Sequence, residues 1–192
     1  MASIVVGSAQ TLENLLTAYE GESNAHARYT AFAKKADEEG WHGAASLLRA
    51  AARAEQIHAG HHARVIKQLG GEARCSLHPA EVKDTLSNLK AALEGEQYEV
   101  AAMYPGFIAE ARVRAHAAAL RAFQYALEAE KTHARLFAEA VRQVEAGKKS
   151  GWAGAARVFY VCAVCGFTSD QAETLDHCPG CKALWERFEI VQ

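Results

Sequence analysis

The sequence Ala54-Glu-Gln-Ile-His-Ala59 recurs 75 residues later as Ala129-Glu-Lys-Thr-His-Ala134. In each copy a glutamate stands three positions before a histidine, and a helix places residues with this spacing on one face. Each copy can therefore direct a carboxylate and an imidazole toward one point. A single pair of this kind carries little weight, but two matched pairs predict a shared site inside a helical bundle.

A second repeated pattern precedes each pair. Asn14-Leu-Leu-Thr-Ala-Tyr-Glu-Gly-Glu22 resembles Asn88-Leu-Lys-Ala-Ala-Leu-Glu-Gly-Glu96, so each half of the chain reads as a helical hairpin. Two such hairpins related by a pseudo-twofold axis would enclose a dinuclear, carboxylate-bridged metal site in the core of a four-helix bundle. The six predicted ligands of that site are Glu22, Glu55, His58, Glu96, Glu130 and His133.

The ligand set favours hard or borderline divalent metals, iron and manganese above all. We expect Glu22 and Glu96 to be terminal ligands, while Glu55 and Glu130 could bridge the two ions. The alternative is that these glutamates are solvated charges on helix surfaces and the histidines are incidental. The duplication of the whole set disfavours that alternative, because short motifs occur singly by chance.

Composition narrows the functional classes. The 192 residues carry a formal charge of −2 and are 50% hydrophobic, which gives no reason to expect nucleic acid or an acidic membrane as a partner. The sequence contains no run of about 20 apolar residues, the length that a membrane-spanning helix requires. The first ten residues lack the basic stretch and apolar core of a signal peptide, so we expect a cytoplasmic protein.

Apolar spacing predicts a mainly α fold with helices over about 11–35 and 41–69, followed by a third that starts after Pro79. Tyr104-Pro105-Gly106 favours a kink or a break in that third helix. The pattern is helical again to Val144, and we place the turn into the fourth helix at about 112–116. His61 and His62 follow His58 by one turn, where a solvated or capping role is expected.

The C-terminal part has a different composition. A polar and flexible linker is predicted at 147–154, which divides the chain into domains at 1–146 and 155–192. Four of the five cysteines form two knuckles, Cys162-Ala-Val-Cys165 and Cys178-Pro-Gly-Cys181. This spacing predicts a tetrahedral site for zinc or a single iron, and spacing alone does not choose between them. The fifth, Cys75, is expected to be a buried inert thiol.

Taken in order, several of these motifs resemble the rubrerythrin family over essentially the whole chain. They are Gly21-Glu22-Ser23, Arg28-Tyr29, Glu55-x-x-His58, Gly95-Glu96-x-x-Glu99, Tyr104-Pro105, Glu130-x-x-His133 and the cysteine domain. The resemblance implies a ferritin-like four-helix bundle followed by a small rubredoxin-like β domain. It also implies two irons in the bundle, one iron in the cysteine site, and reduction of hydrogen peroxide to water.

The resemblance further implies a homo-oligomer that receives electrons from a reductase or a rubredoxin, with the tail of one subunit beside the di-iron site of another. Glu99 matches an additional glutamate of the family that competes with His58 for one iron. Tyr29 and Tyr104, seven and eight residues after Glu22 and Glu96, could donate hydrogen bonds to ligand carboxylates. Ordinary core packing is the alternative for both tyrosines. We take Glu99, Tyr29 and Tyr104 as the candidate catalytic residues.

Two other functions are compatible with the sequence. One is a ferritin-like protein that oxidises and handles iron, although a mineral store does not need a cysteine domain. The other is a structural bundle that carries a zinc ribbon for protein contacts, because zinc in the cysteine site would have no redox chemistry.

Overall fold

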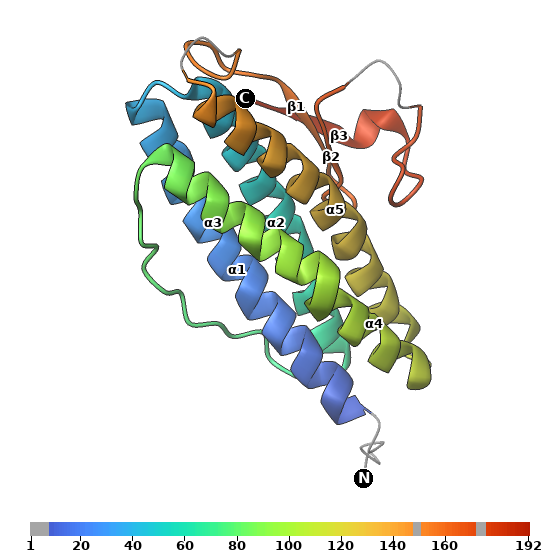
Figure 1. The fold of residues 1–192 in the computed structure, drawn as a ribbon. Helices are drawn as coiled ribbons and strands as arrows, with labels where there is room; N and C mark the ends of the chain where they lie inside the picture. The colour runs from blue at the N-terminus through green and yellow to red at the C-terminus, as the bar shows by residue number, and fades with distance from the viewer. Residues whose placement is uncertain (1–7, 148–150, 172–175) are drawn as a thin grey trace.

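The computed structural model describes residues 8–147, 151–171 and 176–192. Two long helical hairpins form a four-helix bundle, and a small sheet lies against one side of it (Figure 1). The predicted fold class, a mainly α bundle followed by a small cysteine-bearing β domain, is therefore confirmed. No helix of the described residues is both long and apolar enough to cross a membrane.

The first hairpin consists of α1 (Ser8–Glu38) and α2 (His42–Gln68). Both helices lie within a few residues of the ranges predicted from apolar spacing. The chain reverses at Gly40, whose φ of 77° lies in the left-handed region that glycine adopts without strain. Leu15, Ala18 and Phe32 of α1 are at most 2% exposed because their spacing keeps them on the inward face.

The second hairpin begins with α3 (Thr85–Tyr98), which continues without interruption through the π-helix η1 (Glu99–Met103) into α4 (Tyr104–Val113). The start lies at Thr85 and not directly after Pro79, because the Asp84 carboxylate caps the helix by accepting from the Ser87 amide at 3.0 Å. The predicted kink is a change of hydrogen-bond register. Pro105 has no amide hydrogen for the regular α pattern, so the wider π turn accommodates it.

A short turn leads into α5 (Ala117–Glu145), within the region predicted for it. Ala115 adopts a left-handed φ of 52° in this turn. The segment 71–84, which connects the two hairpins, contains no helix or strand and runs along α1 of its own chain (Figure 1). The Asn24 side chain holds it there by bonding the Ser76 carbonyl at 3.0 Å and the His78 amide at 2.8 Å.

The cysteine domain contains β1 (Phe159–Cys162), β2 (Thr168–Ser169), the short 3-10 helix η2 (Trp185–Arg187) and β3 (Phe188–Val191). Its antiparallel sheet has the order β2-β1-β3, with Tyr160 opposite Ser169 on one side and opposite Ile190 on the other. Phe159 and Val161 of β1 are fully buried in the same apolar cluster as side chains of the bundle. The small domain therefore shares its core with the helices.

Part of the predicted linker is packed against the bundle. Residues 148–150 lie outside the described residues, but Trp152 is only 3% exposed and its carbonyl accepts from the Gly43 amide at 3.0 Å. The Arg157 guanidinium stacks over the Trp152 ring at 4.7 Å. Trp152 thus anchors the cysteine domain to the turn between α1 and α2. Cys75, in the connection between the hairpins, is partly exposed and not buried as predicted.

Candidate metal centre

The structure brings the six predicted bundle ligands together in the core, where each is at most 2% exposed. Their ligand atoms form two groups of four, and within each group all the atoms lie within 4.8 Å of one another. The first group is Glu22, Glu55, His58 and Glu130; the second is Glu55, Glu96, Glu130 and His133. Glu55 and Glu130 belong to both groups, so two adjacent ions could share them.

Unsatisfied polar atoms indicate that the cluster fits metal ions. Both oxygens of Glu130 and one oxygen each of Glu22, Glu55 and Glu96 make no hydrogen bond within the described part of the chain. Nδ1 of His133 lies 2.7 Å from a Glu130 oxygen but is not aligned for a hydrogen bond with it. Buried polar atoms rarely remain unpaired. These atoms converge on common points, as ligands of shared cations do.

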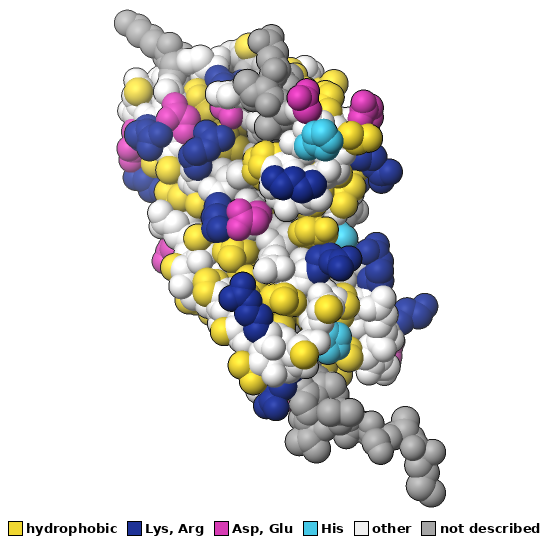
Figure 2. Space-filling view, turned by 90° about the vertical axis from the view of Figure 1, so that its right-hand side faces the viewer, with side chains coloured by type: hydrophobic (Ala, Val, Ile, Leu, Met, Phe, Trp, Pro, Cys, Tyr) yellow, Lys and Arg dark blue, Asp and Glu magenta, His cyan; other side chains and the backbone are white. Residues whose placement is uncertain are grey.

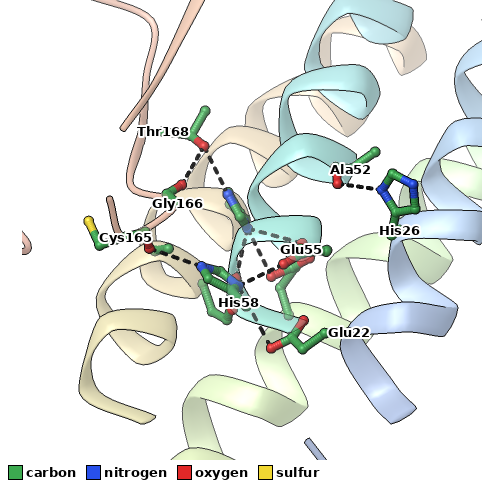
Figure 3. Close-up of polar contacts among 12 residues, drawn as sticks. Glu22, His26, Ala52, Glu55, His58, Cys165, Gly166 and Thr168 are labelled. Atoms are coloured by element: carbon green, nitrogen blue, oxygen red, sulfur yellow. Dashed lines mark hydrogen bonds and ion pairs between the residues drawn. The ribbon is translucent and has the colours of Figure 1, made fainter. Parts of the chain in front are cut away.

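The outer nitrogens of both histidines fix the imidazole tautomers. His58 Nε2 lies 3.1 Å from the Cys165 carbonyl, which can only accept, so this nitrogen carries the hydrogen (Figure 3). His133 Nε2 lies 3.0 Å from the Thr168 hydroxyl, whose own hydrogen goes to the Gly166 carbonyl. Thr168 must therefore accept from His133. Each Nδ1 faces the carboxylates, and with a metal bound it would present its lone pair to that metal. In the structure His58 Nδ1 lies 2.9 Å from a Glu55 oxygen. Burial would lower the pKa of both histidines, but the surrounding carboxylates hold it well above the ordinary value.

Electrostatics within the cluster also favour cations. Burial, with added repulsion from Glu130 and Glu55, raises the pKa of Glu22 to about 8. Burial and the same kind of repulsion hold the pKa of Glu96 well above its ordinary value. Burial would raise the pKa of Glu130 too, but the adjacent His58 and His133 keep it below its ordinary value. Carboxylates this crowded need positive charge between them, and two divalent ions supply it.

The two tyrosines connect the halves of the bundle crosswise. Tyr29 on α1 donates to a Glu96 oxygen on α3 at 2.6 Å, and Tyr104 on α4 donates to a Glu22 oxygen on α1. Both phenols are at most 1% exposed. Along the sequence Tyr104 follows Glu96 by eight residues, whereas Tyr29 follows Glu22 by seven. The π-helix η1 takes up that extra residue, and Tyr104 keeps the position equivalent to Tyr29.

Glu99 is the first residue of η1 and is not part of either four-residue group. It is half-buried beside the cluster. Burial, followed by repulsion from Glu22 and Glu130, holds its pKa well above the ordinary value. The structure therefore places Glu99 beside the predicted ligands but outside both four-residue groups.

His62 is a residue that the sequence-based interpretation missed. Its expected solvated or capping role is wrong: the side chain is fully buried, and Nε2 lies 3.2 Å from the Tyr104 hydroxyl. Because Tyr104 gives its hydrogen to Glu22, His62 must donate to the phenol oxygen. Burial lowers the pKa of His62 to about 3, so the imidazole is neutral. His62 therefore donates to Tyr104, and Tyr104 donates to Glu22, so the two hydrogen bonds run in one direction.

The remaining histidines near the cluster have other partners. His26 bonds the Ala52 carbonyl at 2.7 Å and is turned away from the carboxylates (Figure 3), so it is not one of the candidate ligands. His61 Nε2 lies 2.6 Å from the Val164 carbonyl in the first cysteine knuckle. His61 therefore contacts the cysteine domain and is not a solvated residue.

The four cysteines also converge. The Cys162 and Cys181 sulfurs lie 3.7 Å apart, and those of Cys165 and Cys178 lie 3.5 Å apart. A tetrahedral ion with metal–sulfur bonds of about 2.3 Å requires sulfur separations of about 3.8 Å. All four sulfurs lie within 4.8 Å of one another, which fits one zinc or one iron.

The cysteine domain lies against the bundle site of its own chain. A single residue, Gly166, makes the close approach possible: a Cβ at this position would collide with the His58 ring, and its φ is 80°. The resemblance implied that the tail would lie beside another subunit's site. In this structure the contact is made within one chain.

A four-helix bundle that encloses carboxylates and histidines for two adjacent ions defines the class of ferritin-like di-iron proteins. The chain belongs to the rubrerythrin family, whose family model matches residues 13–141. This confirms the resemblance seen in the sequence. The cofactors expected of the family, two irons in the bundle and one iron or zinc in the rubredoxin-like site, fit the two residue clusters.

The chain is 34% identical to rubrerythrin-2 of Clostridium acetobutylicum over 96% of this chain and 98% of that protein. It is 36% identical to nigerythrin of Nitratidesulfovibrio vulgaris over 92% of this chain and 83% of the relative. The solved structure of fully reduced, all-ferrous nigerythrin matches with a TM-score of 0.83 at 34% identity, covering 94% of this chain and 86% of that one.

Replacing Gly166 tests the contact between the domains. Gly166→Ala adds strain of about 1–2 kcal/mol from the left-handed backbone and a collision with His58, so we expect the cysteine domain to separate from the bundle. Gly154→Ala has the same kind of φ, 75°, but meets no atom within 4 Å. Hydrogen exchange at β1 and β2 in the zinc-loaded protein should rise only in the first variant. An equal rise in both variants would contradict this role of Gly166.

Coupling between His62 and Tyr104 can be measured by a double-mutant cycle in unfolding free energy. We expect a coupling of about 1 kcal/mol between His62→Leu and Tyr104→Phe, because they share a buried hydrogen bond. His26→Leu is the matched control, since His26 bonds Ala52 and not Tyr104. A coupling no larger than that of the control would show that His62 does not orient the phenol.

Deletion of the exposed Ala101 should convert η1 to a regular α-helix. The spacing from Glu96 to Tyr104 would then be seven residues, as it is from Glu22 to Tyr29, so Tyr104 should still reach Glu22. We expect the deletion variant to bind two metal ions per bundle, as the length-preserving control Ala101→Ser does, measured by metal analysis. Loss of metal binding by the deletion variant, with full binding by Ala101→Ser, would contradict the spacing argument.

Proposed function

We propose that this protein is a peroxidase that reduces hydrogen peroxide to water at the bundle site, with electrons supplied through the cysteine site. The reaction consumes two electrons and two protons per peroxide. One observation carries the proposal: the Cys165 carbonyl in a cysteine knuckle accepts a hydrogen bond from His58, whose other nitrogen faces the carboxylate cluster. A redox centre and a dinuclear site are thus joined by one imidazole.

We propose the following roles for the ligands. Glu22 and Glu96 each belong to one group and serve as terminal ligands, whereas Glu55 and Glu130 belong to both and bridge. His58 and His133 are the nitrogen ligands; Cys162, Cys165, Cys178 and Cys181 hold the third metal. When bound, a pair of irons supplies two electrons for cleavage of the oxygen–oxygen bond, and a tetrathiolate iron exchanges single electrons.

Glu99 is proposed as an alternative ligand to His58. Burial, followed by repulsion from Glu22 and Glu130, holds the pKa of its carboxyl well above the ordinary value. A carboxylate favours ferric iron because its charge offsets the additional positive charge, while neutral imidazole is relatively better for ferrous iron. The position of Glu99 in the π-helix, outside both groups, is compatible with a ligand that joins the site in only one oxidation state.

Tyr29 and Tyr104 keep Glu96 and Glu22 in place from opposite halves of the bundle. Each phenol donates its hydrogen to one oxygen of a terminal carboxylate and so orients that carboxylate. The second oxygen of the carboxylate makes no hydrogen bond to any described residue and can bind a metal. Burial, with repulsion from the neighbouring glutamates, keeps the pKa of both tyrosines well above the ordinary value. Both therefore remain protonated donors throughout the working pH range.

The iron-storage alternative has less support. The Desulfovibrio desulfuricans bacterioferritin structure matches with a TM-score of 0.70 at 20% identity, covering 78% of this chain and 90% of that one, a likeness that shows the fold alone. An iron store does not require a cysteine domain bonded to both histidines of the bundle site. The electron donor is proposed to be a reductase or a rubredoxin, acting on a cytoplasmic homo-oligomer.

Peroxide consumption by the iron-loaded chain tests this function. Reduced wild-type protein should consume peroxide repeatedly while a donor is present. Cys178→Ser should abolish donor-driven turnover but leave a chemically reduced bundle site able to consume peroxide once, because only electron delivery is lost. Cys75→Ser is the matched control and should turn over normally. Loss of the single turnover in Cys178→Ser would contradict separate roles for the cysteine site in electron delivery and the bundle site in peroxide reduction. No peroxide consumption by wild-type protein would exclude the peroxidase function.

A further inference from the structure

Two surface hollows lie on either side of His61, where α2 meets the first cysteine knuckle. One, of about 240 Å³, lies between α2 and α5 and reaches Tyr125. The other, of about 340 Å³, is bounded by α2, by Ala163 and Val164 of the knuckle, and by η2. His61 and Arg64 line both hollows, so the two form one continuous region of the surface.

The region is positively charged. Arg64 borders both hollows, Arg121 borders the first and Arg187 the second. Among the described residues no Asp or Glu lines either hollow, and none of these three exposed arginines forms an ion pair with a carboxylate. The whole chain has a formal charge of −2. The positive charge here is thus a local concentration on a slightly acidic protein.

Figure 2 views the molecule from the side of α5 and the cysteine domain. Lys and Arg side chains extend down this face, while most Asp and Glu side chains gather toward its upper end. We name Arg64, Arg121 and Arg187 together the arginine surface. Its members come from α2, α5 and η2, so it spans the junction between the two domains.

The arginine surface lies directly over the cysteine site. Ala163 and Val164, which line the second hollow, are the two residues between Cys162 and Cys165. Tyr125, which lines the first, packs against the cysteine cluster and meets the His61 ring edge-on at 5.8 Å. A redox partner seated here would lie against the knuckle whose Cys165 carbonyl contacts His58.

We propose that the arginine surface is the docking site for an acidic protein with a one-electron redox centre, an inference that rests on the proposed peroxidase function. Complementary charge steers such a partner and fixes its orientation. A small anion would occupy one hollow, whereas three arginines from three elements suit an extended acidic face. In each encounter the donor loses one electron and the cysteine site gains it, so two encounters supply the electrons for one peroxide.

Binding can be measured without any redox activity. The full chain with zinc in the cysteine site is titrated with an oxidised rubredoxin of net negative charge at low salt. Arg64→Glu/Arg121→Glu/Arg187→Glu should weaken binding by about tenfold or more, because like charges then face one another. Lys34→Glu reverses one exposed charge on α1, away from the arginine surface; it is the control for a reversal elsewhere and should change binding little. High salt should weaken wild-type binding in the same direction.

Electron transfer provides the second measurement, with the iron-loaded chain. The triple variant should be reduced about tenfold more slowly by the reduced rubredoxin, but at least as fast as wild type by cationic reduced methyl viologen. Equal rubredoxin binding by wild type and triple variant, or equal weakening in Lys34→Glu, would overturn the docking site. Failure of methyl viologen to support peroxide reduction would instead overturn the peroxidase function, while the binding result still decides the docking site.

Discussion

The burial of four carboxylates and two imidazoles in one bundle core is the constraint on which the structure depends. Charged groups removed from water are costly unless opposite charge or hydrogen bonds compensate them. The surrounding residues meet part of that need: two tyrosines donate to Glu22 and Glu96, and the cysteine domain accepts from both histidines. The oxygens that remain unpaired define where cations belong.

Much of this arrangement could be predicted from the sequence. Glu55 and His58 share a helix face by spacing alone, and the repeat in the second half supplies Glu130 and His133. The cysteine knuckles are equally local, because each knuckle consists of two cysteines three positions apart. These features depend on short-range geometry, which a single sequence carries well.

Other features depend on contacts between distant segments, and the sequence does not reveal them. His62 is buried because Phe123 and Tyr104, far along the chain, surround its ring. Trp152 lies in a polar stretch typical of a linker, yet it packs on the turn between α1 and α2. One signal was available: Tyr104 stands one residue further from Glu96 than Tyr29 does from Glu22, which indicates an inserted residue and hence a π-helix.

That inserted residue ends the equivalence of the two halves. With identical hairpins, two ions related by a twofold axis would have the same surroundings and the same affinity for an electron. The π-helix is present in only one hairpin, and its first residue, Glu99, stands where the first half has Ala25. The inserted residue and this replacement make the surroundings of the two metal positions chemically different.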